Sequence, residues 1–341
     1  MVMVMAAMMV MNQKLNYWKN NKMVNAKILS CGSYLPKKIL TNFDLEKMVE
    51  TSDEWIFSRT GIRQRHIAAE NELTSDLAYF AALDALKKSV LKPSDIDMII
   101  VATTTPDLTF PATATIVQSK LGIKSGFAFD VQAVCSGFIY ALNIANNFIK
   151  VGQIKNALVI GAEILSRIVN WQDRNSCILF GDGAGAVVLS ATDDNNCGIL
   201  ANNLYSDGDY NNLLNTSGGV SLSGTAGYIQ MAGKEIFKHA TEKMSDCVLE
   251  IIKKANLKLE DIDWLVPHQA NARIISAVAK RLSLPEEKII LTVDKHANSS
   301  AASIPMALDF AVNQNKIKNG DIVVLEALGG GLTWGAIILK W

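Results

Sequence analysis

The sequence predicts an α/β fold that is built from two similar halves. Continuous apolar, β-branched runs alternate along the chain with segments whose apolar residues recur at the spacing of an amphipathic helix. Unbroken apolar strands separated by helices are typical of parallel sheets that are covered on both faces. With 341 residues the chain exceeds the ~100 to 200 residues of a usual domain, so we expect two units or one large fused core.

The expected elements follow one another in a regular order, which predicts layers of sheet packed between layers of helix. The apolar runs predict strands at 96–105, 157–164, 186–190, 262–266, 288–293, 321–327 and 336–340. The helical patterns predict helices at 75–90, 112–121, 138–151, 235–255, 271–282 and 301–314.

Segments that are far apart in the sequence resemble each other, which indicates an internal duplication. Residues 86–97 align with residues 252–263 at an offset of 166, and a shorter match that begins at Ile154 has an offset of 163. The offset of 163 also places Cys135 opposite Asn298. Two copies of one unit would present these side chains from equivalent helix starts that face each other.

We expect the chain to consist of two duplicated halves that follow a short N-terminal extension. We expect residues 24–195 to form the first half and residues 196–341 to form the second. Residues 1–23 are expected to be a disordered or over-long start, with Met23 as an alternative initiator. Their apolar stretch is well below the ~20 residues that span a bilayer, and no positively charged segment precedes it, which argues against a signal peptide.

The composition excludes several classes of function. The 33 basic and 33 acidic residues balance, so the chain has neither a global basic field for nucleic acid nor an acidic tail, and any acidic partner must meet a local patch. The odd number of scattered cysteines, without a CxxC pair, argues against a disulfide framework and a zinc site, and favours the reducing cytoplasm. The cysteines are Cys31, Cys135, Cys177, Cys197 and Cys247.

Cys135 in the first half lies where a thiol can act as a nucleophile. A short apolar run ends just before it, and a helical pattern begins at Phe138. A cysteine at the start of a helix is close to unpaired backbone N–H groups and to the positive end of the helix dipole, which lower the pKa of the thiol from about 8.5. Taken alone, Cys135 also fits a buried structural cysteine.

His268 and Asn298 in the second half occupy similar corners. Each follows a strand-like run and precedes a helical pattern, as Cys135 does. A lone histidine or asparagine usually satisfies a core or a turn, but the three residues at equivalent corners predict one assembled site.

Two glycine-rich segments fit backbone geometry better than nucleotide binding. Residues 180–186 lack the G-x-G-x-x-G spacing and lead into a strand, and residues 329–335 lack the Lys-Ser/Thr of a P-loop. Glycines without side chains let backbone N–H groups approach a ligand closely, as an oxyanion hole requires.

Together these residues resemble β-ketoacyl-acyl carrier protein synthase III, the initiating condensing enzyme family of bacterial fatty acid synthesis within the thiolase superfamily. The resemblance runs from about residue 24 to the C-terminus. Two positions depart from the family pattern, since Ala297 stands where glycine is frequent and Leu328 where an aromatic residue is common. The matching motifs are 51–56 (TSDEWI), 59–63 (RTGIR), the Cys135 segment, 266–271 (VPHQAN), the Asn298 segment and 329–335 (GGGLTWG).

The resemblance implies a thiolase-like duplicated fold and a catalytic role for Cys135, His268 and Asn298. The backbone N–H groups of Cys135 and Gly330 would form the oxyanion hole. The Cys135 thiolate would take an acyl group from an acyl-CoA primer, and malonyl-acyl carrier protein would then condense with it after decarboxylation. The enzyme would thus be an acyltransferase that performs more than one step, without a cofactor or a metal ion.

Binding residues are also implied by the resemblance. Trp55 would stack on the CoA adenine, Arg59 and Arg174 would hold its phosphates, and Phe110 would limit the primer pocket of the partner subunit in a homodimer. Without the resemblance, Trp55 and Phe110 fit ordinary core packing and the arginines fit a solvated face.

The helix after His268 is expected to bind acyl carrier protein through a basic face, although a solvated face is the alternative. Arg273, Lys280 and Arg281 lie at i, i+7 and i+8 and therefore share one side of this helix. The expected partners are acyl carrier protein, acyl-CoA and a second copy of the chain, with neither nucleic acid nor membrane. The expected carrier-binding residues are Gln269, Ala270, Asn271, Ala272, Arg273, Lys280 and Arg281.

Three other functions stay open from the sequence. One is a related condensing enzyme of polyketide, alkylquinolone or hydroxymethylglutaryl type with another primer or acceptor. The second is a catalytically silent subunit that binds carrier protein, and the third is a cysteine hydrolase.

Overall fold

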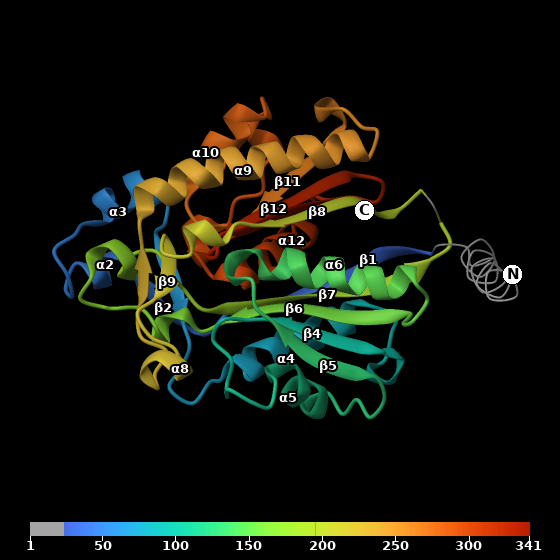
Figure 1. Ribbon diagram of the computed structural model, residues 1–341, viewed down its shortest axis with the longest axis horizontal. Coiled ribbons are helices and arrows are strands. Elements are labelled where there is room, and N and C mark those ends of the chain that lie inside the picture. The colour runs from blue at the N-terminus through green and yellow to red at the C-terminus, as the bar shows by residue number, and fades with distance from the viewer. Residues whose placement is uncertain (1–23, 195) are drawn as a thin grey trace, which may run out of the picture.

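The α/β prediction is confirmed in the computed structural model, which describes residues 24–194 and 196–341 (Figure 1). Two sheets alternate with layers of helices, so that helices cover both faces of each sheet. The predicted extension at 1–23 lies outside the described residues.

The first sheet is formed by the first half of the chain and has the strand order β1-β7-β6-β4-β5. The pairs β4/β5 and β4/β6 are parallel, whereas β6/β7 and β1/β7 are antiparallel. Its strands are β1 (Asn25–Tyr34), β4 (Met98–Ala102), β5 (Phe127–Val131), β6 (Asn156–Glu163) and β7 (Gly183–Thr192).

The second sheet is formed by the second half and has the order β11-β12-β13-β8. The pair β11/β12 is parallel, and the pairs β12/β13 and β13/β8 are antiparallel. Its strands are β8 (Gly198–Ser206), β11 (Trp264–Pro267), β12 (Ile322–Gly329) and β13 (Thr333–Lys340).

The helices form three layers around these sheets. Helices α6 and α12 lie between the sheets in a core that both sheets share, α4 and α5 cover the far side of the first sheet, and α9 and α10 cover the far side of the second (Figure 1). The long helices are α4 (Thr74–Lys88), α5 (Thr113–Lys120), α6 (Gly137–Lys150), α9 (Gly233–Lys254), α10 (Ala272–Arg281) and α12 (Ser303–Asn313).

The two sheets repeat the same pairing pattern, which agrees with the predicted duplication. Reading from β1 and from β8, both sheets show two antiparallel pairs followed by a parallel pair. The division of the chain at 195/196 stays a prediction. It is supported by the fact that all strands of the first sheet precede this point and all strands of the second follow it.

The prediction of a strand at 288–293 is wrong. Only Ile289 of this segment forms a bridge, which pairs it in parallel with Leu265 of β11 in the second sheet. The corresponding edge of the first sheet is occupied by a full strand, β5. The segment does not continue along β11 because the backbone N–H groups of Thr292 and Val293 donate instead to the side-chain oxygen of Gln269, at 2.9 and 3.2 Å.

The expectation of parallel sheets is correct for some of the strand pairs and wrong for the others. A parallel connection needs a crossover, usually a helix, whereas β12 and β13 are joined by a short glycine turn and therefore run antiparallel. The sequence also missed β1, β5 and β8, whose apolar residues are interrupted by polar ones.

Short elements at one end of the molecule surround the site described below. They are β2 (Lys38–Thr41), α2 (Asn42–Leu45), α3 (Asp53–Thr60), β3 (Gln64–Ile67), α7 (Arg174–Cys177), β9 (Leu214–Thr216), α8 (Val220–Ser223), β10 (Ile229–Met231) and α11 (Val293–His296).

None of the helices among the described residues is long and apolar enough to span a bilayer.

Candidate active site

Cys135 lies in a tight turn directly before α6. The 3₁₀ turn Val134–Ser136 follows β5, and the Ser136 hydroxyl donates to the Ala133 carbonyl at 2.8 Å. The end of β12 approaches this turn so closely that a Cβ on Gly329 would lie 2.7 Å from the backbone nitrogen of Cys135. A glycine is therefore required where the second half of the chain contacts the cysteine turn.

The environment of the Cys135 thiol differs from the sequence prediction. The side chain is only 5% exposed, and this burial raises the pKa of the thiol to about 12. The Ser300 hydroxyl opposes the increase and the Glu163 carboxylate adds to it. Desolvation thus outweighs the position at the helix start, and the resting thiol is protonated at neutral pH.

His268 follows β11 and is held by contacts on both its backbone and its ring. Its backbone N–H donates to the Glu326 carbonyl at 2.8 Å, and its Nδ1 lies 2.7 Å from the Ser303 hydroxyl oxygen. Burial lowers the pKa of the imidazole to about 3, so the ring is neutral. A neutral imidazole can donate one hydrogen bond to a ligand without being an acid.

Asn298 is fixed by the segment that leads into α12. Its side-chain oxygen accepts a hydrogen bond from the Ser300 backbone N–H at 2.9 Å, which leaves the amide NH₂ to donate. Its own backbone bonds to Leu179 and Gly181 on either side of an isolated bridge with Phe180.

The two departures from the family pattern have different structural consequences. Ala297 adopts φ 54° and ψ −159°, a conformation that favours glycine, so the backbone before Asn298 keeps the shape that a glycine would allow. Leu328 is buried in the core between the second sheet and α9.

The segment from Asn298 to Ser303 joins the three predicted catalytic residues. Ser300 is close to the Cys135 side chain and bonds to Asn298, and Ser303 bonds to His268. The structure therefore places Cys135, His268 and Asn298 around one short stretch of chain.

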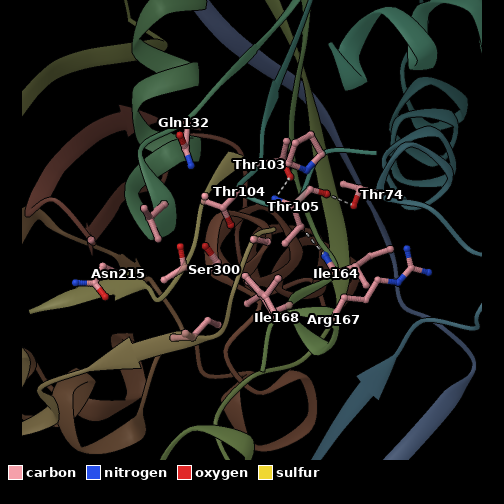
Figure 2. A pocket seen from close by; sticks show the side chains of 18 of the residues that line it. Thr74, Thr103, Thr104, Thr105, Gln132, Ile164, Arg167, Ile168, Asn215 and Ser300 are labelled. Atoms are coloured by element: carbon pink, nitrogen blue, oxygen red, sulfur yellow. Dashed lines mark hydrogen bonds between the residues drawn. The ribbon is translucent and has the colours of Figure 1, made fainter. Parts of the chain in front are cut away.

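Cys135 lies in the wall of a cavity of about 1040 Å³. Figure 2 shows other residues of this wall, among them Gln132 and Asn215. The wall also includes Gly330, whose expected role in an oxyanion hole stays a prediction, whereas His268 and Asn298 are not part of the wall. Apolar parts of the wall come from Phe180, Leu214 and Ile229, among other residues.

A fully buried carboxyl group supports one wall of this cavity. Glu163, at the end of β6, accepts hydrogen bonds from the Thr104 and Thr105 hydroxyls at 2.9 and 2.7 Å and from the Thr104 backbone N–H at 3.1 Å. Figure 2 shows these threonines on the cavity wall with Ser300. Burial raises the pKa of the Glu163 carboxyl group to about 7. The sequence analysis missed Glu163, although it could have been noticed as the one acidic residue in an apolar strand.

The three residues that the resemblance assigns to CoA do come together. The guanidinium carbons of Arg59 and Arg174 lie 4.6 and 4.5 Å from the centre of the Trp55 ring. Arg174 also donates to the Glu50 carbonyl at 2.9 Å. Trp55 is half-buried, so its surface is not used for core packing alone.

Phe110 is not a core residue, because 83% of its surface is exposed. Its neighbour Leu108 and also Val220 are exposed apolar residues that line the cavity. Phe110 itself does not line the cavity within this chain.

The residues predicted to bind carrier protein fall into two groups. The prediction for Gln269 is wrong, because this side chain is fully buried and bonds to the Pro267 and Ile290 carbonyls. Ala270 is half-buried, and the Asn271 side chain caps α10 and bonds to the Arg59 carbonyl.

The basic face of α10 adjoins a groove of about 510 Å³ between α3, α9 and α10. The groove is lined by Phe57, Phe237 and Ala272, with Arg273 and Lys280 among its residues. Arg281 is engaged elsewhere, since it bonds to the Asp246 carboxylate at 2.8 Å.

Among the described residues no group of three or more His, Cys, Asp or Glu side chains is arranged to hold a metal ion.

Comparisons with known proteins give one consistent family. The family model described as 3-oxoacyl-[acyl-carrier-protein (ACP)] synthase III matches residues 129–208, and the model of its C-terminal part matches residues 252–341. A curated β-ketoacyl-[acyl-carrier-protein] synthase III from Ehrlichia canis is 59% identical over 92% of this chain and 98% of its own length.

Solved structures agree with this assignment. The 3-oxoacyl-[acyl-carrier-protein] synthase III of Aquifex aeolicus has a TM-score of 0.89 at 50% identity and covers 93% of this chain and 100% of its own. The priming β-ketosynthase of the R1128 polyketide pathway has a TM-score of 0.88 at 30% identity and covers 94% and 97%. The duplicated, thiolase-like fold is thereby confirmed, and the chain belongs to the β-ketoacyl-[acyl-carrier-protein] synthase III family of condensing acyltransferases.

Proposed function

We propose that the protein joins a short acyl-CoA primer, with acetyl-CoA as the expected one, to malonyl-acyl carrier protein. The products are a 3-oxoacyl-acyl carrier protein, CoA and CO₂. The observation that carries this proposal is the segment from Asn298 to Ser303, in which Ser300 lies close to the Cys135 side chain while hydrogen bonds from Ser300 and Ser303 fix Asn298 and His268.

The first step is acyl transfer to Cys135. The sulfur attacks the thioester carbon, the bond from that carbon to the CoA sulfur breaks, and the thiol proton leaves with CoA as its thiol. The negative charge that develops on the carbonyl oxygen is stabilised by the N–H groups of Cys135 and Gly330. Burial raises the pKa of the Cys135 thiol, so forming the reactive thiolate in this site is unfavourable before the substrate binds.

The second step is decarboxylation of the malonyl group. Loss of CO₂ leaves an enolate, whose oxygen accepts hydrogen bonds from the His268 ring and the Asn298 amide. The enolate carbon then attacks the acyl carbon on Cys135, which forms the new carbon–carbon bond and releases the cysteine sulfur to regain a proton. Both donors are neutral, so they stabilise the enolate without protonating it.

Trp55, Arg59 and Arg174 are proposed to bind the nucleotide part of CoA. The two guanidinium groups lie over the Trp55 ring, and an adenine that stacks on this ring takes the place of one of them. The displaced arginine is then free to pair with a CoA phosphate.

A second copy of the chain is proposed to complete the primer pocket. Phe110 and Leu108 form an exposed apolar surface next to the cavity mouth, as expected for a homodimer interface. Phe110→Asp is expected to shift the molecular mass in solution from dimer to monomer and to admit longer primers. A wild-type monomer would contradict this proposal.

Acyl carrier protein is proposed to dock on α10 at the groove beside Phe57 and Phe237. Acidic side chains of the carrier would pair with Arg273 and Lys280, while an apolar side chain enters the groove.

Reversing the charge of Arg273 and Lys280 to Glu should raise the KM for malonyl-carrier protein about tenfold and weaken its salt dependence. Cys135 acylation by acyl-CoA should stay unchanged. Arg281→Glu is the matched control with a smaller effect, because Arg281 is already paired with Asp246. Equal losses for both substrates would show that the helix serves the CoA site or the fold.

A cytoplasmic location is part of the same proposal. All five cysteines are free, as expected in a reducing compartment.

A related condensing enzyme with another primer or acceptor is the second candidate, favoured by the likeness to the R1128 priming ketosynthase. Purified protein incubated with a panel of acyl-CoA primers and malonyl-carrier protein distinguishes the two. Acetyl-CoA as the preferred primer supports the first proposal, and a longer or branched primer supports the second. A product without a new carbon–carbon bond would contradict both.

A further inference from the structure

A buried chain of hydrogen bonds reaches His268 from the side away from its reactive nitrogen. The backbone N–H of Gln269 donates to the Ser303 hydroxyl oxygen at 3.3 Å, and that oxygen lies 2.7 Å from His268 Nδ1. Gln269 is fully buried, and Ser303 and His268 are only 2% and 4% exposed. Bulk water therefore does not compete for these contacts.

The tautomer of His268 follows from the number of hydrogens that this hydrogen-bond network can donate. A serine hydroxyl has one hydrogen to donate, and the Ser303 oxygen already accepts one from Gln269. Within the part of the chain that the structure describes, His268 Nδ1 is the one acceptor in hydrogen-bonding distance of that hydroxyl. If Nδ1 carried the ring proton, the buried hydroxyl hydrogen would have no acceptor, which is unfavourable.

We propose that Ser303 is a positioning residue that donates to His268 Nδ1 and thereby keeps the ring proton on Nε2. The inference about the tautomer stands on the hydrogen bonds alone, and its catalytic consequence rests on the proposed function. With Nδ1 used as an acceptor, the neutral ring presents an N–H donor at its other nitrogen.

Gln269 fixes the geometry of this chain. Its side-chain NH₂ donates to the Pro267 and Ile290 carbonyls at 2.8 and 3.1 Å, and its oxygen accepts from the Thr292 N–H at 2.9 Å. These bonds hold the backbone whose N–H points at Ser303. Gln269 thus supports the histidine from within the core instead of contacting a partner.

The arrangement matches that of Asn298. The Ser300 N–H fixes the Asn298 oxygen and leaves its NH₂ to donate, and Ser303 fixes His268 Nδ1 and leaves Nε2–H to donate. One segment of six residues, from Asn298 to Ser303, therefore sets which atoms of both groups are left to donate. Substrate does not have to reorient either group before the enolate forms.

The tautomer can be measured directly by ¹⁵N NMR of protein labelled at its four histidines. The coupling of each ring nitrogen to the ring protons separates Nδ1 from Nε2, and the spectrum of His268→Asn assigns the signals. We expect the wild-type protein to show a protonated Nε2 and an unprotonated Nδ1 at neutral pH. A protonated Nδ1 overturns the proposal without any variant.

Ser303→Ala tests the role of the hydroxyl. Its loss should populate the other tautomer and lower the rate of malonyl decarboxylation about tenfold, as for other residues that orient a functional histidine. Acyl transfer to Cys135 should change less than about twofold, because the first step does not use this donor. Ser303→Thr keeps the hydroxyl and should restore both the NMR signature and the rate.

Ser299→Ala is the matched control. Ser299 is buried in the same segment, but its hydroxyl contacts the Met306 sulfur at 4.0 Å and not a ring nitrogen. The His268 signals in the NMR spectrum of Ser299→Ala should equal those of the wild type. If Ser303→Ala keeps both the Nε2–H tautomer and the wild-type decarboxylation rate, the proposal is wrong. A wild-type protein that does not condense substrates would refute the proposed function, and the NMR result would still decide the tautomer.

Discussion

A 3₁₀ turn directly precedes each helix of the central layer, Val134–Ser136 before α6 and Ser300–Ala302 before α12. Both turns begin at a residue with a positive φ, 49° at Val134 and 48° at Ser300, but Cys135 lies inside the first turn whereas Asn298 lies two residues before the second. Residues held in this region cost free energy and persist only where the surrounding structure determines them. The same backbone device was thus kept in both copies.

The two helix starts differ in the side chains that they hold. Cys135 in the first turn offers a thiol that can form a bond, whereas Asn298 just before the second turn offers an amide whose oxygen is fixed by the Ser300 N–H. The two halves thus use the same turn differently, and we propose that the first supplies the nucleophile and the second a donor to the enolate. The four predictions that follow test this division, from the largest expected effect to the smallest.

Cys135→Ser should abolish both acyl-enzyme formation and condensation. A hydroxyl in the same buried position is harder to deprotonate than a thiol, and its oxygen is a far weaker nucleophile toward a thioester than sulfur. The mass of the intact protein after incubation with acetyl-CoA measures acylation directly. An acetylated Cys135→Ser protein would place the nucleophile outside this turn and end the comparison.

His268→Ala and Asn298→Ala should lose malonyl decarboxylation by about 10² to 10³ in rate, because each removes a preorganised donor to the enolate oxygen. Both variants should still accept an acyl group on Cys135. Release of labelled CO₂ and the mass of the acyl-enzyme measure the two steps separately. Variants that decarboxylate normally but are not acylated would show that these residues act on the thiol.

Glu163→Gln should make Cys135 more reactive, because it removes a negative charge that raises the thiol pKa. Burial raises the pKa of Glu163 to about 7, so the carboxyl is charged above that pH and neutral below it. The increase should therefore be seen above pH 7, at about threefold in the rate of Cys135 alkylation, and disappear by about pH 6.

Peptide mapping after iodoacetamide treatment measures this rate across the pH series. Glu326→Gln is the matched control, since Glu326 is equally buried but influences Cys247. An identical increase in both variants would mean that the change reflects a loosened fold and not the charge beside Cys135.

The grouping of Cys135, His268 and Asn298 could be predicted from the sequence because each ends an apolar run just before a helical one. The predicted pairing of Cys135 with Asn298 at an offset of 163 is wrong, since the 3₁₀ turns that begin at Val134 and Ser300 correspond at an offset of 166. The supporting residues could not be found in this way. Ser303 and Glu163 are single polar residues whose roles depend on contacts between segments far apart in the chain.

Pairing in the sheets was only partly predictable for a similar reason. The apolar run at 288–293 reads as a strand, but its N–H groups bond to the Gln269 side chain, a contact that no local pattern records. The antiparallel turn between β12 and β13 could have been inferred from the glycines at its centre. The burial that protonates Cys135 depends on the packing of both halves and outweighs the local effect of the helix start.

Ala297→Gly should stabilise the protein slightly, which makes it the smallest expected effect. Glycine adopts φ 54° and ψ −159° without the clash that a Cβ causes, and strain in this region is worth on the order of 1 to 3 kcal/mol. The more flexible unfolded chain of the glycine variant offsets about 0.4 to 1 kcal/mol of this gain.

We therefore expect a net increase of about 1 kcal/mol in the free energy of unfolding, measured from the denaturant midpoint, with unchanged kcat. Val134→Gly should not show this gain, because the Val134 side chain packs against Gly330. A Cβ atom added to that glycine would lie 3.5 Å from Val134 Cγ2. A destabilised Ala297→Gly protein would show that the buried methyl group of Ala297 contributes more than its backbone strain costs. In that case the positive φ before Asn298 would be maintained by the packing of the Ala297 side chain.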